Sequence, residues 1–346
     1  MKVLLYSEGM KWIQKSGLGR AIKHQQQALE LAKVPFTTNE KEDFDLVHIN
    51  TYFLKSRIFV KKWKKKGIPV VYHAHSTEED FRNSFLFSNQ VAPLFRRWIV
   101  HCYNLGDVII TPTFYSKQLL EQAGVTKPIY PVSNGIDLRY YQSTPVMREE
   151  FRETYQYKKT DKVVMAVGLY IKRKGILDFV ELAKRMPEVH FIWFGALNLK
   201  QVPKEIRQAV RTELPNLRFA GYVSPAELRK AYAGADLFFF PTYEETEGIV
   251  LMEAMAMEQN ILVRDIPIYA EYEHSKELYK GANLIDFEKQ IKGILDGTLP
   301  SLKQAARKKV SERDIHKIGE QLKEVYQTAI KLGTSPTASK TQKANK

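Results

Sequence analysis

Short runs of β-branched and aromatic residues recur along this chain, separated by longer stretches whose apolar residues have helical spacing. After the turn-rich stretch PVSNGIDLRYY the alternation begins again. Strands that alternate with helices in this way form parallel sheets with crossover helices, so the pattern predicts an α/β protein with two doubly wound domains. The expected strands are 2–6, 45–49, 68–73 and 107–112 before that stretch, and 162–168, 189–195, 217–223, 236–242 and 260–265 after it.

The length of the chain supports the same division, because 346 residues exceed what one hydrophobic core usually accommodates. We expect an N-terminal domain over 1–145 and a C-terminal domain over 146–315. A helix over 316–333, with apolar residues at helical spacing, could cross back to the N-terminal domain. Residues 334–346 contain several lysines and no large apolar side chain, which predicts a disordered basic tail.

The charge of the chain predicts an anionic partner. Lys and Arg total 53 against 39 Asp and Glu, which gives a net charge of +14, and nucleic acid, anionic lipid and nucleotide phosphates all fit it.

The single cysteine, Cys102, fits a reducing compartment. The N-terminus has the pattern of a strand rather than a signal peptide, and no stretch approaches the ~20 apolar residues that span a bilayer. We therefore expect a cytoplasmic protein.

Two glutamates follow the expected strand DLFFFPT. Glu245 falls in the strand-to-helix loop, and Glu253 falls in the second turn of the helix that Gly248 opens. Backbone N–H groups around Gly248, Ile249 and Val250 form a site for an anion such as a diphosphate, which the helix dipole favours. Carboxylates beside that site can accept hydrogen bonds from sugar or ribose hydroxyls. The alternative is that the acidic residues of this loop only cap the helix.

The two glutamates, with seven residues between them and with Pro241, Gly248 and the helix EAMA around them, resemble the signature of family 4 retaining glycosyltransferases of the GT-B fold. The resemblance runs up to about residue 330, and the string YEETEGIV is similar to bacterial enzymes that build glycolipids on diacylglycerol. It implies two Rossmann-like domains facing a central cleft and a nucleotide sugar as donor. It also implies that Glu253 contacts the nucleotide ribose and that Glu245 faces the donor sugar.

A basic pair, Arg173 and Lys174, follows the first expected strand of the C-terminal domain. Arg offers a forked donor and Lys a point charge, and both suit phosphate oxygens. Cations solvated in a loop are the alternative. In the resembled family, Arg and Lys at this place stabilise the departing nucleotide diphosphate. Many relatives carry Arg directly after the glycine, where this chain has Leu169, so Arg173 could take over that role.

The string KSGLGR, with Gly17 and Gly19, follows the first expected strand and predicts a loop that approaches a phosphate or a sugar. The third glycine of a dinucleotide fingerprint would fall at Ile22, which disfavours a nicotinamide enzyme. In the resembled family this loop lies over the donor diphosphate and the acceptor site.

His73 and His75 lie at the end of the expected strand IPVVYH. Two histidines with one residue between them can bind a metal, but no cysteine or carboxylate at recognisable ligand spacing accompanies them, so we expect no metal site. A buried, hydrogen-bonded histidine is the other alternative. By its position His75 matches the active-site histidine of the resembled family, near the donor sugar, and we expect His73 to be structural.

Two segments, KSRIFVKKWKKK at 55–66 and FRNSFLFSNQVAPLFRRWIV at 81–100, combine cations with aromatic side chains. We expect an interfacial helix and headgroup anchors at an anionic membrane surface. The alternative is that Phe59 and Val60 face the core of the N-terminal domain while the lysines are solvated. The residues predicted to contact the membrane or the acceptor are Lys61, Lys62, Trp63, Lys64, Lys65, Lys66, Arg96, Arg97 and Trp98.

These patterns and the resemblance together predict a retaining, metal-independent hexosyltransferase. We expect it to move galactose, our first choice, or glucose from UDP-galactose or UDP-glucose to a glycolipid such as monoglucosyldiacylglycerol, at the inner face of the cell membrane. No further cofactor and no nucleic acid are expected. The predicted catalytic residues are His75, Arg173, Lys174 and Glu245, and the predicted donor-binding residues are Gly17, Gly19, Arg173, Lys174, Gly248, Ile249, Val250 and Glu253.

Two other functions stay open. One is a soluble family 4 glycosyltransferase of polysaccharide assembly. The other is a non-catalytic basic protein that binds nucleic acid, which explains the lysines but not the glutamates of the C-terminal domain.

Overall fold

The computed structural model describes residues 1–14 and 16–333, and these residues form two compact units. The first unit comprises Met1–Glu78, Pro93–Gly135 and the described part of Arg313–Lys346, and the second comprises Glu79–Ala92 and Ile136–Glu312. The chain crosses from the first unit to the long segment of the second after Gly135, whereas the expected domain boundary is at 145. The predicted basic tail lies outside the described residues.

The sheet of the first unit is parallel throughout, with the strand order β2-β1-β3-β4-β5-β6. Strands β3, β4 and β5 are buried along their whole length, as expected for strands covered by helices on both faces. The bounds are β1 Val3–Tyr6, β2 Phe36–Thr37, β3 Leu46–Ile49, β4 Val70–His73, β5 Val108–Thr111 and β6 Ile129–Pro131.

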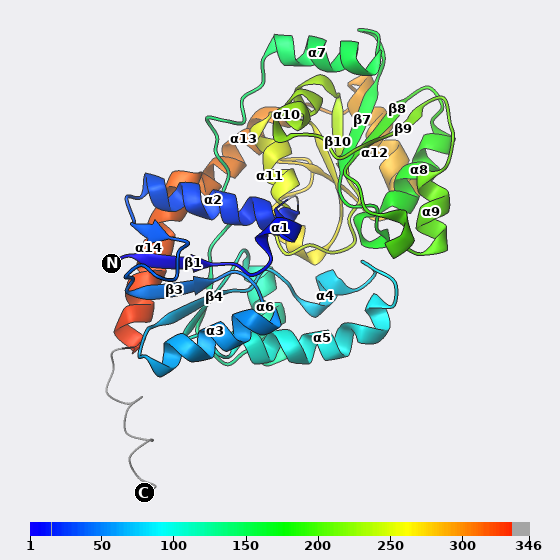
Figure 1. Ribbon diagram of the computed structural model, residues 1–346. Coiled ribbons are helices and arrows are strands. Elements are labelled where there is room, and N and C mark those ends of the chain that lie inside the picture. The colour runs from blue at the N-terminus through cyan, green and yellow to red at the C-terminus, as the bar shows by residue number, and fades with distance from the viewer. Residues whose placement is uncertain (15, 334–346) are drawn as a thin grey trace, which may run out of the picture. The chain divides into compact units, whose positions relative to one another are not determined.

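Helices cover both faces of this sheet. Helices α2 and α14 contribute apolar side chains to one face, and Figure 1 shows these two helices side by side although they lie near opposite ends of the chain. Helices α3, α5 and α6 contribute to the core on the other face. The bounds are α1 Met10–Ile13, α2 Gly17–Leu31, α3 Leu54–Lys65, α4 Glu78–Phe81, α5 Ser88–Tyr103, α6 Phe114–Ala123 and α14 Ile315–Gly333.

The sheet of the second unit is also parallel, with the strand order β12-β11-β10-β7-β8-β9. All the strands expected from the sequence are confirmed, as is the α/β class with two Rossmann-like domains. Strands β2, β6 and β12 were not anticipated, because each is only two or three residues long. The bounds are β7 Val163–Val167, β8 His190–Phe194, β9 Leu217–Gly221, β10 Leu237–Phe240, β11 Ile261–Arg264 and β12 Tyr279–Gly281.

The helices of the second unit include two pairs that pack against each other, α7 with α10 and α11 with α13, while α8 and α12 cover the core cluster of the sheet. The bounds are α7 Pro145–Tyr155, η1 Lys172–Lys174, α8 Ile176–Arg185, η2 Leu199–Gln201, α9 Lys204–Val210, α10 Pro225–Gly234, α11 Ile249–Ala256, η3 Pro267–Glu271, α12 Leu284–Asp296 and α13 Lys303–Val310, with η4 at Ser311–Arg313 leading to α14.

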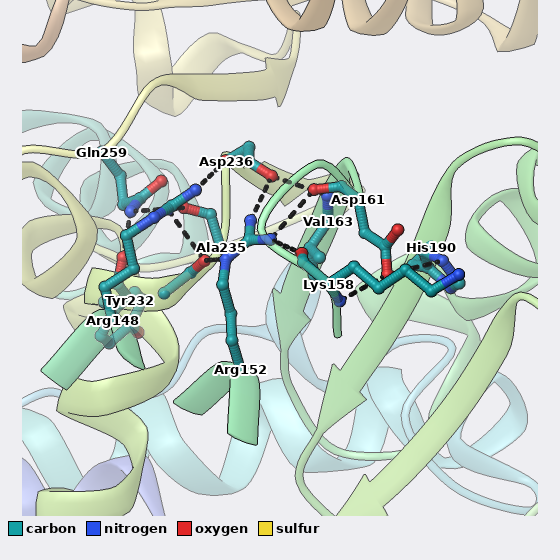
Figure 2. Close-up of polar contacts among 11 residues, drawn as sticks. Arg148, Arg152, Lys158, Asp161, Val163, His190, Tyr232, Ala235, Asp236 and Gln259 are labelled. Carbon is teal, nitrogen blue, oxygen red and sulfur yellow. Dashed lines mark hydrogen bonds and ion pairs between the residues drawn. The ribbon is translucent and has the colours of Figure 1, made fainter. Parts of the chain in front are cut away.

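A partly buried ion-pair network ties α7 to the start of two strands, as Figure 2 shows. The Asp236 carboxylate, just before β10, accepts hydrogen bonds from Arg148 and from Arg152, each at 2.9 Å, and from the backbone N–H of Val163 at 2.9 Å. Each oxygen of the carboxylate thus has a charged partner, Arg148 for one and Arg152 for the other. The network fixes the edge of the unit from which β7 and β10 run toward the residues of the candidate site.

No helix among the described residues is both long enough and apolar enough to cross a bilayer.

Candidate active site

Arg173 and Lys174 lie in the short helix η1, which follows β7. The backbone of this turn is fixed by hydrogen bonds from Arg173 N to Asn83 O at 3.1 Å and from Tyr243 N to Arg173 O at 2.8 Å. The turn ends at Gly175, whose φ of 78° favours glycine. A Cβ at Gly175 would also lie 2.3 Å from the carbonyl oxygen of Pro241, so a larger residue would separate η1 from the loop after β10.

The structure brings Arg173, Lys174 and Glu245 together in one ion-pair cluster. Lys174 Nζ contacts Glu245 Oε1, and Arg173 Nη1 lies 3.7 Å from the same oxygen. Thr242 Oγ1 donates to this oxygen at 2.9 Å. Burial alone would raise the pKa of Glu245, but Lys174 and Arg173 outweigh it, so the net shift is downward and the carboxylate stays charged. The family resemblance implies that the cations and this glutamate contact different parts of the ligand, whereas here they neutralise one another.

Other groups hold the Arg173 guanidinium in this cluster. Its Nε donates to Ser84 Oγ at 3.1 Å, and its Nη1 donates to Glu244 O at 2.7 Å. Burial is the main cause that lowers the pKa of Lys174, and Glu245 opposes that shift. A nearby anion, whether a carboxylate or a phosphate, therefore stabilises the positive charge of Lys174.

Gly248 is the N-cap of α11, with φ 84°, as predicted for the residue that opens this helix. The first backbone N–H groups of a helix have no partner inside it, so those of Ile249 and Val250 are available to an anion. Phe240, the last residue of β10, connects this helix end with the cluster. Lys174 Nζ lies 5.2 Å from the centre of its ring, and a Cβ at Gly248 would lie 3.3 Å from its Cε1.

Glu253 is fully buried in α11 and is held by two tyrosines. Its Oε1 accepts from the Tyr141 hydroxyl at 2.8 Å, and its Oε2 accepts from the Tyr232 hydroxyl at 3.0 Å. A carboxylate accepts hydrogen bonds from hydroxyl groups, the kind of donor that a ribose offers. Neither tyrosine was predicted from sequence, because their pairing with Glu253 spans distant parts of the chain and no local motif signals it.

Gly17 and Gly19 occupy the first turn of α2 rather than a loop, which corrects the expected loop conformation of KSGLGR. Ser16 caps the helix by accepting from Gly19 N at 3.3 Å. A Cβ at Gly19 would lie 2.4 Å from Ile13 O, so Gly19 lets α2 start against the end of α1. A Cβ at Gly17 would meet no atom within 4 Å.

His75 follows β4 in the first unit and belongs to a cluster of three histidines with His48 and His73. Its ring stacks on that of His73, with centroids 3.8 Å apart, and His48 Nε2 lies 3.2 Å from His73 Nδ1. His48 Nδ1 lies 2.7 Å from the Tyr326 hydroxyl of α14. His73 is buried. Among the described residues no group of three or more His, Cys, Asp or Glu has the arrangement of a metal site.

Two carboxamides connect His75 with His48 by a second route. His75 Nε2 lies 3.0 Å from Asn50 Oδ1, Asn50 Nδ2 donates to Gln25 Oε1 at 2.9 Å, and Gln25 Nε2 lies 2.8 Å from His48 Nε2. Burial lowers the pKa of His75 to about 3 and also lowers that of His48 to about 3. The imidazole of His75 is therefore neutral near pH 7 and can act as a hydrogen-bonding group but not as a cation.

The lysine-rich segment forms α3, but the side chains on its exposed face differ from the expected ones. Phe59 and Val60 are buried in the core of the first unit, and Trp63 packs against the same core. Lys64 pairs with Asp107 at 2.7 Å. The exposed stripe of α3, at helical spacing, consists of Leu54, Ile58, Lys61 and Lys65, flanked by the exposed Lys55, Lys62 and Lys66.

The second predicted membrane segment contains one exposed arginine pair and one inward tryptophan. Trp98 Nε1 donates to Tyr52 O at 2.7 Å, so this indole is anchored within the first unit. Arg96 and Arg97 are exposed and line a hollow of about 580 Å³. Arg96 also donates to Gln122 O at 3.1 Å at the end of α6. The cations of the prediction therefore lie at the surface, whereas both of its tryptophans pack inward.

The fold is shared with solved structures. Anabaena HepE in complex with UDP-glucose aligns with a TM-score of 0.74 at 18% identity, covering 95% of this chain and 100% of that one. A glycosyltransferase from Rickettsia africae aligns with a TM-score of 0.65 at 14% identity, covering 95% and 98%. At these identities the likeness concerns the fold alone, and that fold is GT-B.

Sequence comparison defines the family. Residues 30–140 match the model described as Glycosyltransferase Family 4, and residues 147–313 match Glycosyl transferases group 1. A processive diacylglycerol alpha-glucosyltransferase of Acholeplasma laidlawii is 43% identical over 96% of this chain and 99% of its own length. An alpha-galactosylglucosyldiacylglycerol synthase of Streptococcus pneumoniae is 28% identical over 67% of this chain and 63% of its own length. The chain therefore belongs to glycosyltransferase family 4, which confirms the resemblance seen in its motifs.

Proposed function

We propose that this glycosyltransferase moves a hexose from a UDP-sugar to a diacylglycerol glycolipid, with retention of configuration. The observation that carries the proposal is the cluster of Arg173, Lys174 and Glu245 beside the N-terminus of α11, to which Phe240 connects it. The 43% identical relative, by its name, glucosylates diacylglycerol processively. The name of this relative favours glucose over the expected galactose as the donor sugar. It makes both diacylglycerol and monoglucosyldiacylglycerol candidate acceptors.

In the proposed donor complex the diphosphate binds to the N-terminus of α11 and to Arg173 and Lys174, and Glu253 accepts from the ribose. Negative charge grows on the diphosphate as the bond to the anomeric carbon breaks, so fixed cations there stabilise the transition state more than the ground state. Glu245, which holds these cations in the unliganded cluster, becomes available to sugar hydroxyls once phosphate oxygens replace it. His75 of the first unit is proposed as the neutral active-site histidine.

The acceptor lies in a membrane, so the protein must reach a lipid surface. Exposed Leu54 and Ile58 on α3 provide apolar contact, and the lysines around them attract anionic headgroups. We therefore propose peripheral binding to the inner face of the cell membrane through α3, with Leu54 and Ile58 in place of Trp63.

A product assay tests the proposed function. Purified protein is offered UDP-glucose and UDP-galactose, each with diacylglycerol and with monoglucosyldiacylglycerol in mixed vesicles. The expected product is a glycolipid whose new bond is an α linkage by NMR, with UDP-glucose as the better donor. Glu253→Ala and Lys174→Ala should each weaken UDP binding by at least about tenfold, because each removes a charged hydrogen-bonding group.

The outcomes separate the alternatives. Transfer to neither lipid, with transfer to soluble saccharides, would support a polysaccharide enzyme instead. Binding of polyanions that is unaffected by both substitutions, without any UDP binding, would support the non-catalytic nucleic-acid-binding function.

A further inference from the structure

Tyr269 lies in η3, after β11, with its hydroxyl inside the second unit. The side chain is fully buried. Its hydroxyl has no hydrogen-bond partner among the residues that the structure describes. A buried hydroxyl that makes no hydrogen bond destabilises a protein by about 1–3 kcal/mol, so a phenylalanine would suit this position better if packing were its only role.

The hydroxyl lies at the start of α11. A Cβ built on Gly248 would be 3.4 Å from Tyr269 Oη, so the oxygen is directly beside the N-cap of the helix. The ring also contacts Phe240, with centroids 6.5 Å apart, and Phe240 is the residue over which Lys174 lies. The unpaired hydroxyl therefore lies beside the opening of α11, and Phe240 links it with the cation cluster.

The hydroxyl can only act as a neutral donor or acceptor. Burial raises the pKa of Tyr269 well above 10.0, and Glu245, Tyr272 and Glu244 add to this shift, while Arg173 opposes it. The proton therefore stays on the oxygen near neutral pH. A protonated phenol beside a helix N-terminus complements an anion, because the backbone N–H groups and the O–H all donate.

We propose that the Tyr269 hydroxyl donates a hydrogen bond to the diphosphate of the nucleotide sugar at the N-terminus of α11. This rests on the proposed function, and it adds a residue that no motif of the sequence signals. Tyr269 then supplies to the ligand the hydrogen bond that it lacks within the protein, so ligand binding removes the cost of the unpaired hydroxyl.

The proposal predicts effects of opposite sign on stability and on binding in Tyr269→Phe. Without ligand, the melting temperature of the full chain should be unchanged or higher, because the substitution removes an unpaired polar atom and keeps the ring. The Kd for UDP, measured by calorimetry, should rise on the order of tenfold, since a hydrogen bond to a charged group is lost. Binding of uridine, followed by ligand-detected NMR, should not change.

Tyr279→Phe is the matched control in the same unit. The Tyr279 hydroxyl donates to Pro300 O at 2.6 Å, so its loss should lower the melting temperature and leave the Kd for UDP unchanged.

If Tyr269→Phe behaves like this control, the hydroxyl has a structural role and the proposal is overturned. If the wild-type protein fails to bind UDP at all, the proposed function falls and the proposal with it. Normal UDP binding by both the wild type and Tyr269→Phe overturns the proposal alone.

Discussion

At the scale of single residues, the protonation of His75 depends on its neighbours more than on its own chemistry. Asn50 Oδ1, as oriented by its hydrogen bond to Gln25, accepts from His75 Nε2, which leaves the proton on that nitrogen. If the oxygen and nitrogen of one side-chain amide exchanged places, those of the other amide would have to exchange as well. The pair therefore couples the tautomer of His75 to the state of His48 deeper in the first unit.

Replacing Asn50 with Asp should make the activity depend on pH. The wild-type His75, with its pKa lowered to about 3, stays neutral from pH 5.5 to 8.5, so its titration should not appear in kcat. A carboxylate at position 50 favours the imidazolium and raises the pKa of His75. Protonation would then remove the neutral ring as the pH falls through that raised pKa. We expect kcat at pH 6 to fall below kcat at pH 8.5 in this variant, whereas the wild type shows no such fall.

Long-range ¹H–¹⁵N spectra of the histidine rings would follow the same protonation directly. Asn50→Leu serves as the comparison, because it removes the acceptor without adding a charge and should lower kcat equally at every pH. A flat pH profile in Asn50→Asp, equal to that of the wild type, would contradict the assigned role.

At the scale of elements, Gly175 determines how closely η1 approaches the loop after β10. Gly175→Ala should lower the free energy of unfolding of the second unit by at least about 2 kcal/mol, because the positive φ is strained and the Cβ would collide with Pro241 O. Urea denaturation followed by tryptophan fluorescence measures the change. The same substitution should also weaken UDP binding, since it displaces Arg173 and Lys174.

Gly297→Ala isolates the backbone contribution. Gly297 has a similar φ of 82°, but a Cβ there would meet no atom within 4 Å. Its loss of stability should be about 1 kcal/mol. Equal losses in the two variants would show that contact with Pro241 contributes nothing.

The strands of four or five residues in both sheets could be predicted from the sequence, because they are continuous apolar runs, which are a local signal, whereas β2, β6 and β12 are too short to give one. The face of α3 could not be predicted, because Phe59, Val60 and Trp63 form an apolar stripe that fits a membrane and a protein core equally well. The tyrosines that hold Glu253 and the hydroxyl of Tyr269 depend on contacts between distant segments. Motifs thus located the candidate site, whereas the groups that position its side chains emerged only in three dimensions.

At the scale of the whole molecule, the excess of positive charge should make membrane binding depend on salt. Replacing Lys61, Lys65 and Lys66 with Glu should weaken binding to anionic vesicles by at least about 100-fold, because each basic residue contributes about 1 kcal/mol near such a surface. Raising NaCl from 50 to 300 mM should weaken the wild type in the same direction, since salt screens exposed charges. Flotation with vesicles of phosphatidylglycerol and phosphatidylcholine measures both effects.

A variant of equal net charge provides the control. Lys158, Lys159 and Lys204 are exposed on the second unit, and their replacement with Glu should leave flotation nearly unchanged. If both triple variants lose binding equally, the net charge of the chain and not α3 attracts the membrane.

The return of α14 to the first unit has a consequence for biosynthesis. Ile318, Leu322 and Tyr326 of this helix form part of the apolar core on one face of the first sheet. A growing polypeptide that has emerged from the ribosome only as far as β6 lacks α14, and its strands expose apolar side chains. The second unit, whose segments all precede α14, can complete its own folding earlier. The unit that is translated first is thus the last to be completed.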